Sequence, residues 1–278
     1  MSRVAPERDV LRLTLGEPAQ HRRDTLVGEE PLELRVGGTS LAVTMRTPGA
    51  DFDLAAGFLV SEGVIARSEE LAAMRYCAGA GDDGVNRFNV LDLVLAPSVA
   101  PPGEGVVRAF YTTSSCGLCG KTSIDAVRTR SRFDVSGDPL EVASSLLVTL
   151  PARLREAQQV FERTGGLHAA GLFDGETGEL VELREDVGRH NAVDKVIGWA
   201  LRENRLPLQG TVLLVSGRAS FELVQKAAMA GVPMLCAVSA PSSLAVDLAT
   251  ETGMTLVGFL RDPSLVVYAG EKRVTGSH

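Results

Sequence analysis

The chain has 278 residues, of which 45% are hydrophobic and 23% are charged, a composition typical of a soluble globular protein. Its formal net charge of −7 argues against a general nucleic-acid binder, and its aromatic content of 5% argues against stacking on single-stranded nucleic acid. No apolar run approaches the roughly 20 residues of a membrane helix, and residues 1–16 lack the apolar segment of a secretory signal. We therefore expect a cytoplasmic protein that binds neither membrane nor nucleic acid.

The amino-terminal part of the chain has the pattern of a small α+β lobe. Alternating apolar residues around Gly37 and Gly38 predict a hairpin, and an acidic first turn followed by helical apolar spacing predicts a helix. The expected elements are the hairpin strands 31–36 and 40–45, the helix 51–64 and a strand at 86–95. A segment rich in Pro and Gly at 97–105 ends this part. We expect a flexible tail at 1–22, an amino-terminal lobe at 23–105 and an α/β core at 106–278.

The rest of the chain alternates helical and strand patterns. We expect helices at 141–147, 152–163, 184–201, 221–230 and 244–252, and strands at 167–173, 179–183, 211–215, 233–238 and 255–259. In the last third, short apolar strands are each followed by a turn and a helix. This order predicts parallel strands in a sheet that helices cover.

Two cysteines three residues apart, Cys116 and Cys119, stand in a stretch of Ser, Thr and Gly with little to bury them. Each is followed by a glycine, and the residues after 121 have the spacing of a short helix. A thiol at a helix start has its thiolate stabilised by unpaired backbone N–H groups. The motif therefore predicts reactive sulfur, whereas Cys236 lies inside an apolar strand and Cys77 has no such setting.

Two strand-to-helix turns, 216–220 and 239–243, are both rich in serine, a small residue with a hydroxyl group. In open α/β sheets ligands bind at this edge, and helix amino termini hold anions. Arg218 would add a guanidinium group for bidentate contacts. The alternative is that Ser220 and Ser243 only cap the helices that follow, and the two interpretations are about equally well supported.

Histidines offer two further candidates. His190 and Asp194 are one helical turn apart and could pair, although a charged stripe facing solvent is the commoner outcome of such spacing. His168, between Gly166 and small alanines, has room for a role in a pocket. A zinc site of Cys116, Cys119 and His168 is geometrically possible. Ala170, however, stands where the zinc-dependent deaminases carry their proton-shuttling Glu.

The motifs together resemble the FdhD family of formate dehydrogenase accessory sulfurtransferases. The resemblance covers residues 23–269 and rests on segments in the expected order, at 45–49, 57–63, 114–120, 164–170, 184–195, 215–222 and 240–246. It implies a three-layer, cytidine-deaminase-like α/β/α core with a mixed sheet, in a cytoplasmic protein that is commonly a homodimer. It also implies that sulfur comes from a cysteine desulfurase as a persulfide. The acceptor would be the molybdenum of the bis-molybdopterin guanine dinucleotide cofactor, before that cofactor enters formate dehydrogenase.

The resemblance also assigns roles to residues. The family's persulfide-bearing cysteine falls on Cys116, with Cys119 as the second catalytic candidate. Its cofactor-binding segment, usually Phe-x-Arg-Gly, falls on Phe259, Leu260, Arg261, Asp262, Pro263 and Ser264, with Asp262 in place of the Gly. We add Ser216, Gly217, Arg218, Ser239 and His168 as cofactor-binding candidates, and expect guanine nucleotide to mimic part of the cofactor. No metal site is expected.

Two other functions stay open at this point. One is a zinc-dependent hydrolase of the deaminase type, which the missing Glu disfavours and which metal analysis would detect. The other is a chaperone that binds and delivers the molybdenum cofactor without chemistry, with thiols that are only structural. Rescue of formate dehydrogenase by a variant without cysteines would favour the chaperone.

Overall fold

The structure, a computed structural model, describes residues 3–77, 88–102 and 131–276. The strands are β1 (Glu7–Arg12), β2 (Gln20–Thr25), β3 (Glu30–Val36), β4 (Thr39–Arg46), β5 (Leu71–Tyr76), β6 (Val90–Leu95), β7 (Val142–Ala143), β8 (His168–Asp174), β9 (Leu180–Asp186), β10 (Thr211–Val215), β11 (Met234–Ala237), β12 (Thr255–Arg261), β13 (Ser264–Ala269) and β14 (Val274–Thr275). The helices are α1 (Asp51–Ser61), α3 (Ser144–Leu147), α4 (Leu150–Ala157), α5 (Gln159–Thr164), α6 (Arg189–Arg202), α7 (Phe221–Met229) and α8 (Ser243–Thr252).

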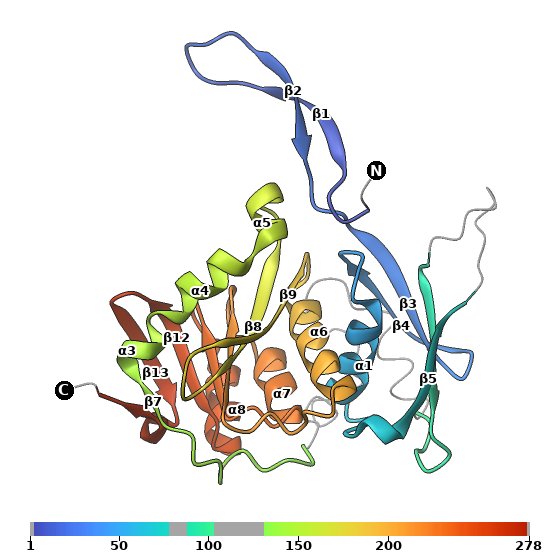
Figure 1. Cartoon of the computed structure of the whole chain (residues 1–278), viewed down its shortest axis with the longest axis vertical. Coiled ribbons are helices and arrows are strands. Elements are labelled where there is room, and N and C mark those ends of the chain that lie inside the picture. The colour runs from blue at the N-terminus through green and yellow to red at the C-terminus, as the bar shows by residue number, and fades with distance from the viewer. Residues whose placement is uncertain (1–2, 78–87, 103–130, 277–278) are drawn as a thin grey trace.

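A six-stranded mixed sheet with the order β13-β12-β11-β10-β8-β9 forms the centre (Figure 1). As the apolar strand–helix pattern predicts, β10 pairs in parallel with β11, and β11 with β12. Because side chains alternate along a strand, Leu213 and Val215 face the layer of α6, α7 and α8. Val212 and Leu214 instead face the layer of α3 and α4. The result is a mixed α/β fold whose central sheet is covered on both faces.

A second, four-stranded sheet has the order β4-β3-β6-β5. The predicted hairpin of β3 and β4 is confirmed, whereas β5 was not predicted. Helix α1 packs between this sheet and α6, so one continuous hydrophobic cluster reaches from the four-stranded sheet to the central sheet. The backbones of α1 and α6 approach closely where Gly57 and Gly198 meet. A Cβ on Gly57 would lie 1.8 Å from the carbonyl oxygen of Asp194, and one on Gly198 equally close to that of Asp53.

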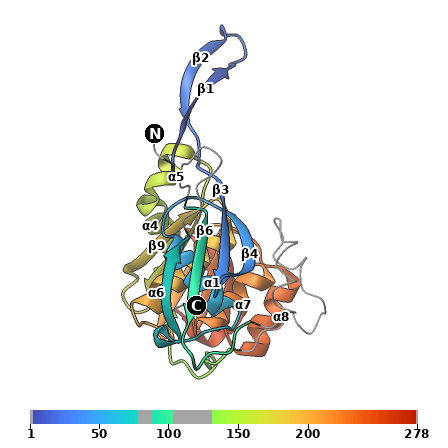
Figure 2. The ribbon, with the colours of Figure 1, turned by 90° about the vertical axis from the view of Figure 1, so that its right-hand side faces the viewer.

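The amino-terminal residues form a hairpin in the structure, where the sequence led us to expect a flexible tail over residues 1–22. Strands β1 and β2 pair antiparallel and project from the body (Figure 2). Their side chains are mostly exposed, and ion pairs link the strands, with Arg23 lying 3.3 Å from Glu7 and 3.7 Å from Asp9. A ribbon without a buried face has no apolar alternation, and this is why the sequence pattern did not indicate it.

The helix expected at 51–64 ends at Ser61, and three other expected helices differ more from their expected bounds. The helix expected at 184–201 begins only at Arg189, because residues up to Asp186 belong to β9 and pair with β8. The helix expected at 152–163 is divided into α4 and α5, where the Glu185 carboxylate accepts hydrogen bonds from Val160 N and Phe161 N at 3.0 and 2.8 Å. The segment 141–147 contains the short β7 and a single turn of α3, because β7 pairs with β14.

Candidate functional site

The turns predicted to bind ligand meet at one edge of the central sheet. Strands β9, β10, β11 and β12 run in the same direction, because β8 is antiparallel to both β9 and β10. Their carboxyl ends therefore open at the same edge, where β8 begins with His168 (Figure 1). In open α/β sheets this edge is the usual place for a ligand.

His168, Ser216 and Gly217 are brought together as expected. The Ser216 hydroxyl accepts a hydrogen bond from Ala169 N at 2.9 Å, and Ser216 N donates to the Ala169 carbonyl at 3.0 Å. A Cβ on Gly217 would lie 3.5 Å from His168 Nδ1 and 3.6 Å from Arg189 Cδ. Residue 217 thus lies directly against an imidazole and the stem of an arginine, and Arg218 beside it is exposed.

The other turns join the same surface. Phe259 N donates to the Ser239 carbonyl at 3.2 Å, and Ser242 N donates to the Ala219 carbonyl at 3.0 Å. A Cβ on Gly258 would lie only 2.8 Å from Pro241 Cδ, so the β12 backbone presses on the turn after β11. These contacts hold the turns after β10 and β11 and the last residues of β12 side by side.

The segment 259–264 forms the end of β12, a tight turn and the first residue of β13. Arg261 pairs with Ser264 across the turn, and the Asp262–Pro263 peptide bond is cis. Phe259 has a left-handed backbone (φ 50°), and the residue is 41% exposed. Arg261, Asp262, Pro263 and Ser264 are exposed as well, whereas Leu260 is buried in the core and cannot touch a ligand through its side chain.

The two serines considered as caps behave differently. The amino-terminal cap of α8 is Ser242, whose hydroxyl accepts from Ala245 N at 3.3 Å, so Ser243 is not the cap. Ser220 occupies the cap position of α7 without making a side-chain cap bond. Its Oγ instead lies 3.3 Å from His190 Nε2. Ser220 is thus oriented by a side chain of α6 instead of serving its own helix.

The two histidines at this edge favour the neutral form. Burial, together with the positive charge of Arg189, lowers the pKa of His168, and Asp186 opposes this only in part. Burial, with Lys226 and Arg189 nearby, lowers the pKa of His190 from its ordinary 6.5 to about 3. Both imidazoles can therefore accept as well as donate hydrogen bonds near neutral pH.

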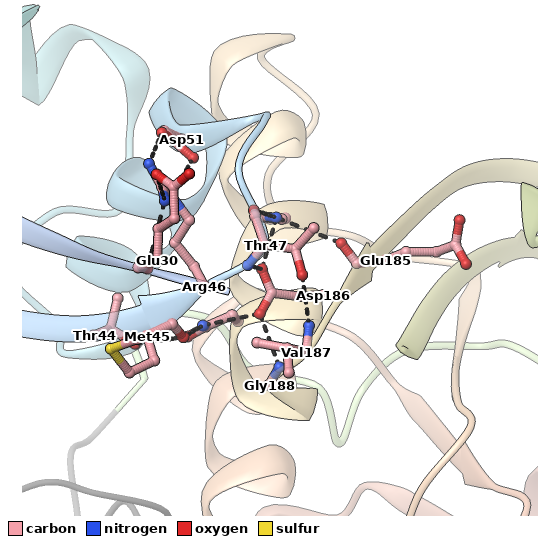
Figure 3. A network of polar contacts seen from close by, with 12 residues as sticks. Glu30, Thr44, Met45, Arg46, Thr47, Asp51, Glu185, Asp186, Val187 and Gly188 are labelled. Atoms are coloured by element: carbon pink, nitrogen blue, oxygen red, sulfur yellow. Dashed lines mark hydrogen bonds and ion pairs between the residues drawn. The ribbon is translucent and has the colours of Figure 1, made fainter. Parts of the chain in front are cut away.

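Asp186, at the end of β9, belongs to a network of polar contacts (Figure 3). Asp186 is fully buried, and its carboxylate lies 2.7 Å from Lys195 Nζ. It also accepts from Gly188 N at 2.8 Å and from Thr47 N at 3.1 Å. Asn191 Nδ2 donates to the same carboxylate at 3.1 Å. One carboxylate thereby joins the end of β9, the start of α6 and the loop after β4.

The expectation of a solvent-facing charged stripe on α6 is wrong. Asp194 and Lys195 are each only 2% exposed. Asp194 lies 2.8 Å from Lys226 Nζ and accepts from the Ser61 hydroxyl at 2.6 Å. The charges turn inward because α1 and α7 pack against α6 and supply partners for them. On the other face of this helix, Val193, Val196, Ile197 and Ala200 are all buried.

The predicted reactive pair, Cys116 and Cys119, lies outside the described residues. Of the cysteines that the structure describes, Cys236 is fully buried, and burial raises the pKa of its thiol. Cys77 is half-buried.

Over the described ranges, no group of three or more His, Cys, Asp and Glu could hold a metal ion. The alternative zinc site considered above includes both cysteines, so the described residues do not test it. No helix in the described part of the chain has the length and apolarity needed to cross a membrane.

One protein-family model covers nearly all the strands and helices described above. The model of the FdhD/NarQ family matches residues 27–275. The chain belongs to the FdhD/NarQ family. The matched residues include every strand and helix from β3 onward, and therefore all the turns that form the edge described above.

Relatives in this family share most of the sequence. A protein of Streptomyces avermitilis named sulfur carrier protein FdhD is 62% identical over 99% of this chain and 97% of its own length. One of the same name from Mycolicibacterium paratuberculosis is 59% identical over 98% and 99%. A solved structure from Desulfotalea psychrophila, described as that of a candidate formate dehydrogenase accessory protein, is 21% identical and superposes with a TM-score of 0.75 over 98% of this chain and all of that one. It supports the fold.

Sequence reasoning missed three residues at this edge, Arg189, Asp186 and Lys195. All three lie in segment 184–195, which carries part of the family resemblance. A signal was present, because Asp186 follows a strand pattern and Gly188 precedes the apolar periodicity of a helix. The uninterrupted helix expected over this segment hid the strand end at which these residues act.

Proposed function

We propose that this chain is a persulfide-based sulfurtransferase that serves formate dehydrogenase. Cys116 takes sulfur from a cysteine desulfurase and passes it to the molybdenum of bis-molybdopterin guanine dinucleotide, which is a substrate bound at the carboxyl edge of the central sheet. In this proposal the sulfur transfer takes place in the cytoplasm. The protein acts as a homodimer, and its core has the deaminase-like three-layer fold.

The observation that carries this proposal is the full-length similarity to relatives named sulfur carrier proteins, in a chain with one pair of thiols suited to the task. Cys236 is excluded as a carrier by its burial and raised pKa. The Cys116 thiolate would attack the outer sulfur of the donor persulfide, and the donor cysteine would leave as a thiolate. Cys116 would then bear the persulfide. On transfer the S–S bond would break, Cys116 would leave as a thiolate, and molybdenum in its Mo(IV) state would supply the two electrons that convert the outer sulfur to sulfide.

The site geometry supports the cofactor part of the proposal. A guanine dinucleotide presents phosphates and an aromatic base, and the edge offers hydroxyl-rich turns, an exposed aromatic ring and two exposed guanidinium groups. In this proposal Arg218 and Arg261 bind phosphate, and the ring of Phe259 stacks on the base. Ser216, Gly217, Ser239 and His168 form the floor beneath the ligand. The exposed residues Asp262, Pro263 and Ser264 flank it, and Leu260 anchors the segment in the core.

Complementation tests the sulfur-transfer role. In a bacterium that lacks its own copy of this protein, wild-type chain should restore formate dehydrogenase activity, and Cys116→Ala should reduce that activity at least about a hundredfold, because no other thiol replaces the carrier. Cys119→Ala should give a partial loss. The matched control is Cys77→Ala, which removes a half-buried thiol and should retain full activity. Full activity of Cys116→Ala at equal protein level would contradict the proposal and favour the chaperone function.

A further inference from the structure

Arg189 is the first residue of α6 and points its stem into the edge where the turns meet. Its Cδ lies 3.6 Å from the position that a Cβ on Gly217 would take, beside His168. The preceding residue, Gly188, occupies the cap position and provides no side chain to accept hydrogen bonds from the first turn. The guanidinium group and the first backbone N–H groups of a 14-residue helix therefore lie at the same place.

Arg189 lacks an anionic partner among the described residues. Its Nε is buried and has no hydrogen-bond acceptor in the described part of the chain. The acid nearest to it in the sequence, Asp186, has a partner of its own. The carboxylate of Asp186 lies 2.7 Å from Lys195 Nζ. Leaving a buried N–H without an acceptor costs about 1–3 kcal/mol.

The positive charge of Arg189 acts on its neighbours. It contributes to the lowered pKa of His168 and of His190. Asp186 raises the pKa of His168, but the lowering by Arg189 is the larger of the two effects. An anion bound at this edge would supply the missing acceptor and would balance that charge. Guanidinium groups and helix amino termini both favour phosphate oxygens.

We propose that Arg189 binds a phosphate group of the guanine dinucleotide at the carboxyl edge of the central sheet, with its Nε–H donating to a phosphate oxygen. This inference rests on the proposed function, because it takes the nucleotide as the ligand of that edge. Gly217 belongs to the same subsite, since a larger side chain there would fill the space between the arginine stem and His168.

Calorimetric titration with GDP, inorganic pyrophosphate and guanosine tests this inference. Arg189→Gln should weaken GDP binding by about tenfold or more, since a charge-assisted hydrogen bond contributes about 1.5–3 kcal/mol. Pyrophosphate should compete with GDP on the wild type, and guanosine should bind both proteins alike. Arg189→Lys should recover part of the affinity, because lysine keeps the positive charge but lacks the planar guanidinium group that binds two oxygens at once. The control is Arg205→Gln, which removes an exposed arginine just beyond the other end of α6 and should leave GDP binding unchanged.

The outcomes separate this inference from the proposed function. If wild type and Arg189→Gln bind GDP equally, the assignment of Arg189 is wrong, while the nucleotide site stands. If the wild type binds neither GDP nor pyrophosphate, both the subsite and the cofactor part of the proposed function are wrong. A role confined to folding predicts a lower melting temperature of ligand-free Arg189→Gln with unchanged GDP affinity, and this result would also overturn the inference.

Discussion

Several charged side chains near the site are buried and form ion pairs with one another instead of being hydrated. Asp186 and Lys195 are almost fully buried and 2.7 Å apart, and Asp194 and Lys226 form a second buried pair. A buried pair of this kind contributes little net stability, but the loss of one member leaves an uncompensated charge that costs about 3–5 kcal/mol. The Asp186 carboxylate also accepts from Gly188 N at the start of α6, and so it holds the segment that carries Arg189.

His190 makes stability depend on pH. Its folded-state pKa of about 3 lies below its ordinary 6.5, so between these values the unfolded chain binds the proton more readily than the folded one. The free energy of unfolding should therefore fall as the pH falls through this range, and His190 should account for about 2 kcal/mol between about pH 7.5 and about pH 5. The groups facing this imidazole are Ser220, Glu222, Lys226, Arg189 and His168.

Urea unfolding at these two pH values measures the effect. His190→Gln keeps a hydrogen-bonding partner for Ser220 but cannot be protonated, so it should lose less stability on acidification than the wild type does. His21→Gln, at an exposed position of β2, is the control and should follow the wild type. Equal acid sensitivity of His190→Gln and wild type would show that His190 is not held neutral by burial.

Among the elements, the pair α1 and α6 is the most tightly constrained. The helices approach so closely that a Cβ on Gly198 would lie 1.8 Å from the Asp53 carbonyl oxygen. Gly198→Ala must push the helices apart, and we expect a loss of roughly 3 kcal/mol in the free energy of unfolding, together with weaker GDP binding because the start of α6 moves. The control is Gly137→Ala, where the nearest atom would be 3.8 Å away. Denaturant melts that agree within about 0.5 kcal/mol for Gly198→Ala and wild type would contradict this packing.

Elements with an apolar pattern could be predicted, whereas elements created by long-range pairing could not. The strands β10, β11 and β12 and the helices α7 and α8 follow from short apolar runs and from serines at helix starts. By contrast, β9 extends to Asp186 because it pairs with β8, although 184–186 fit the helical pattern equally well. Strand β13 was missed because it is partly exposed along its length and follows a proline.

At the scale of the whole molecule, two sheets share the helices between them, and the candidate site lies at the edge of one. The sequence predicted the turns of this edge and most of its residues, because hydroxyl residues after buried strands have a recognised function. It did not predict Arg189 or the buried pairs, because the partners of these charges come from distant segments such as the loop after β4 and helix α7. The projecting hairpin of β1 and β2 was missed because all its faces are polar or exposed (Figure 2).

The central claim, that Cys116 carries sulfur as a persulfide, is tested most directly by intact-mass analysis after incubation with a cysteine desulfurase and cysteine. The wild type should gain the mass of one sulfur atom and lose it again on treatment with a thiol reductant. Cys77→Ala and Cys236→Ala should gain the same mass, and Cys116→Ala should gain none. A Cys116→Ala protein that still acquires the sulfur, or a wild type that carries it on Cys77, would contradict the account.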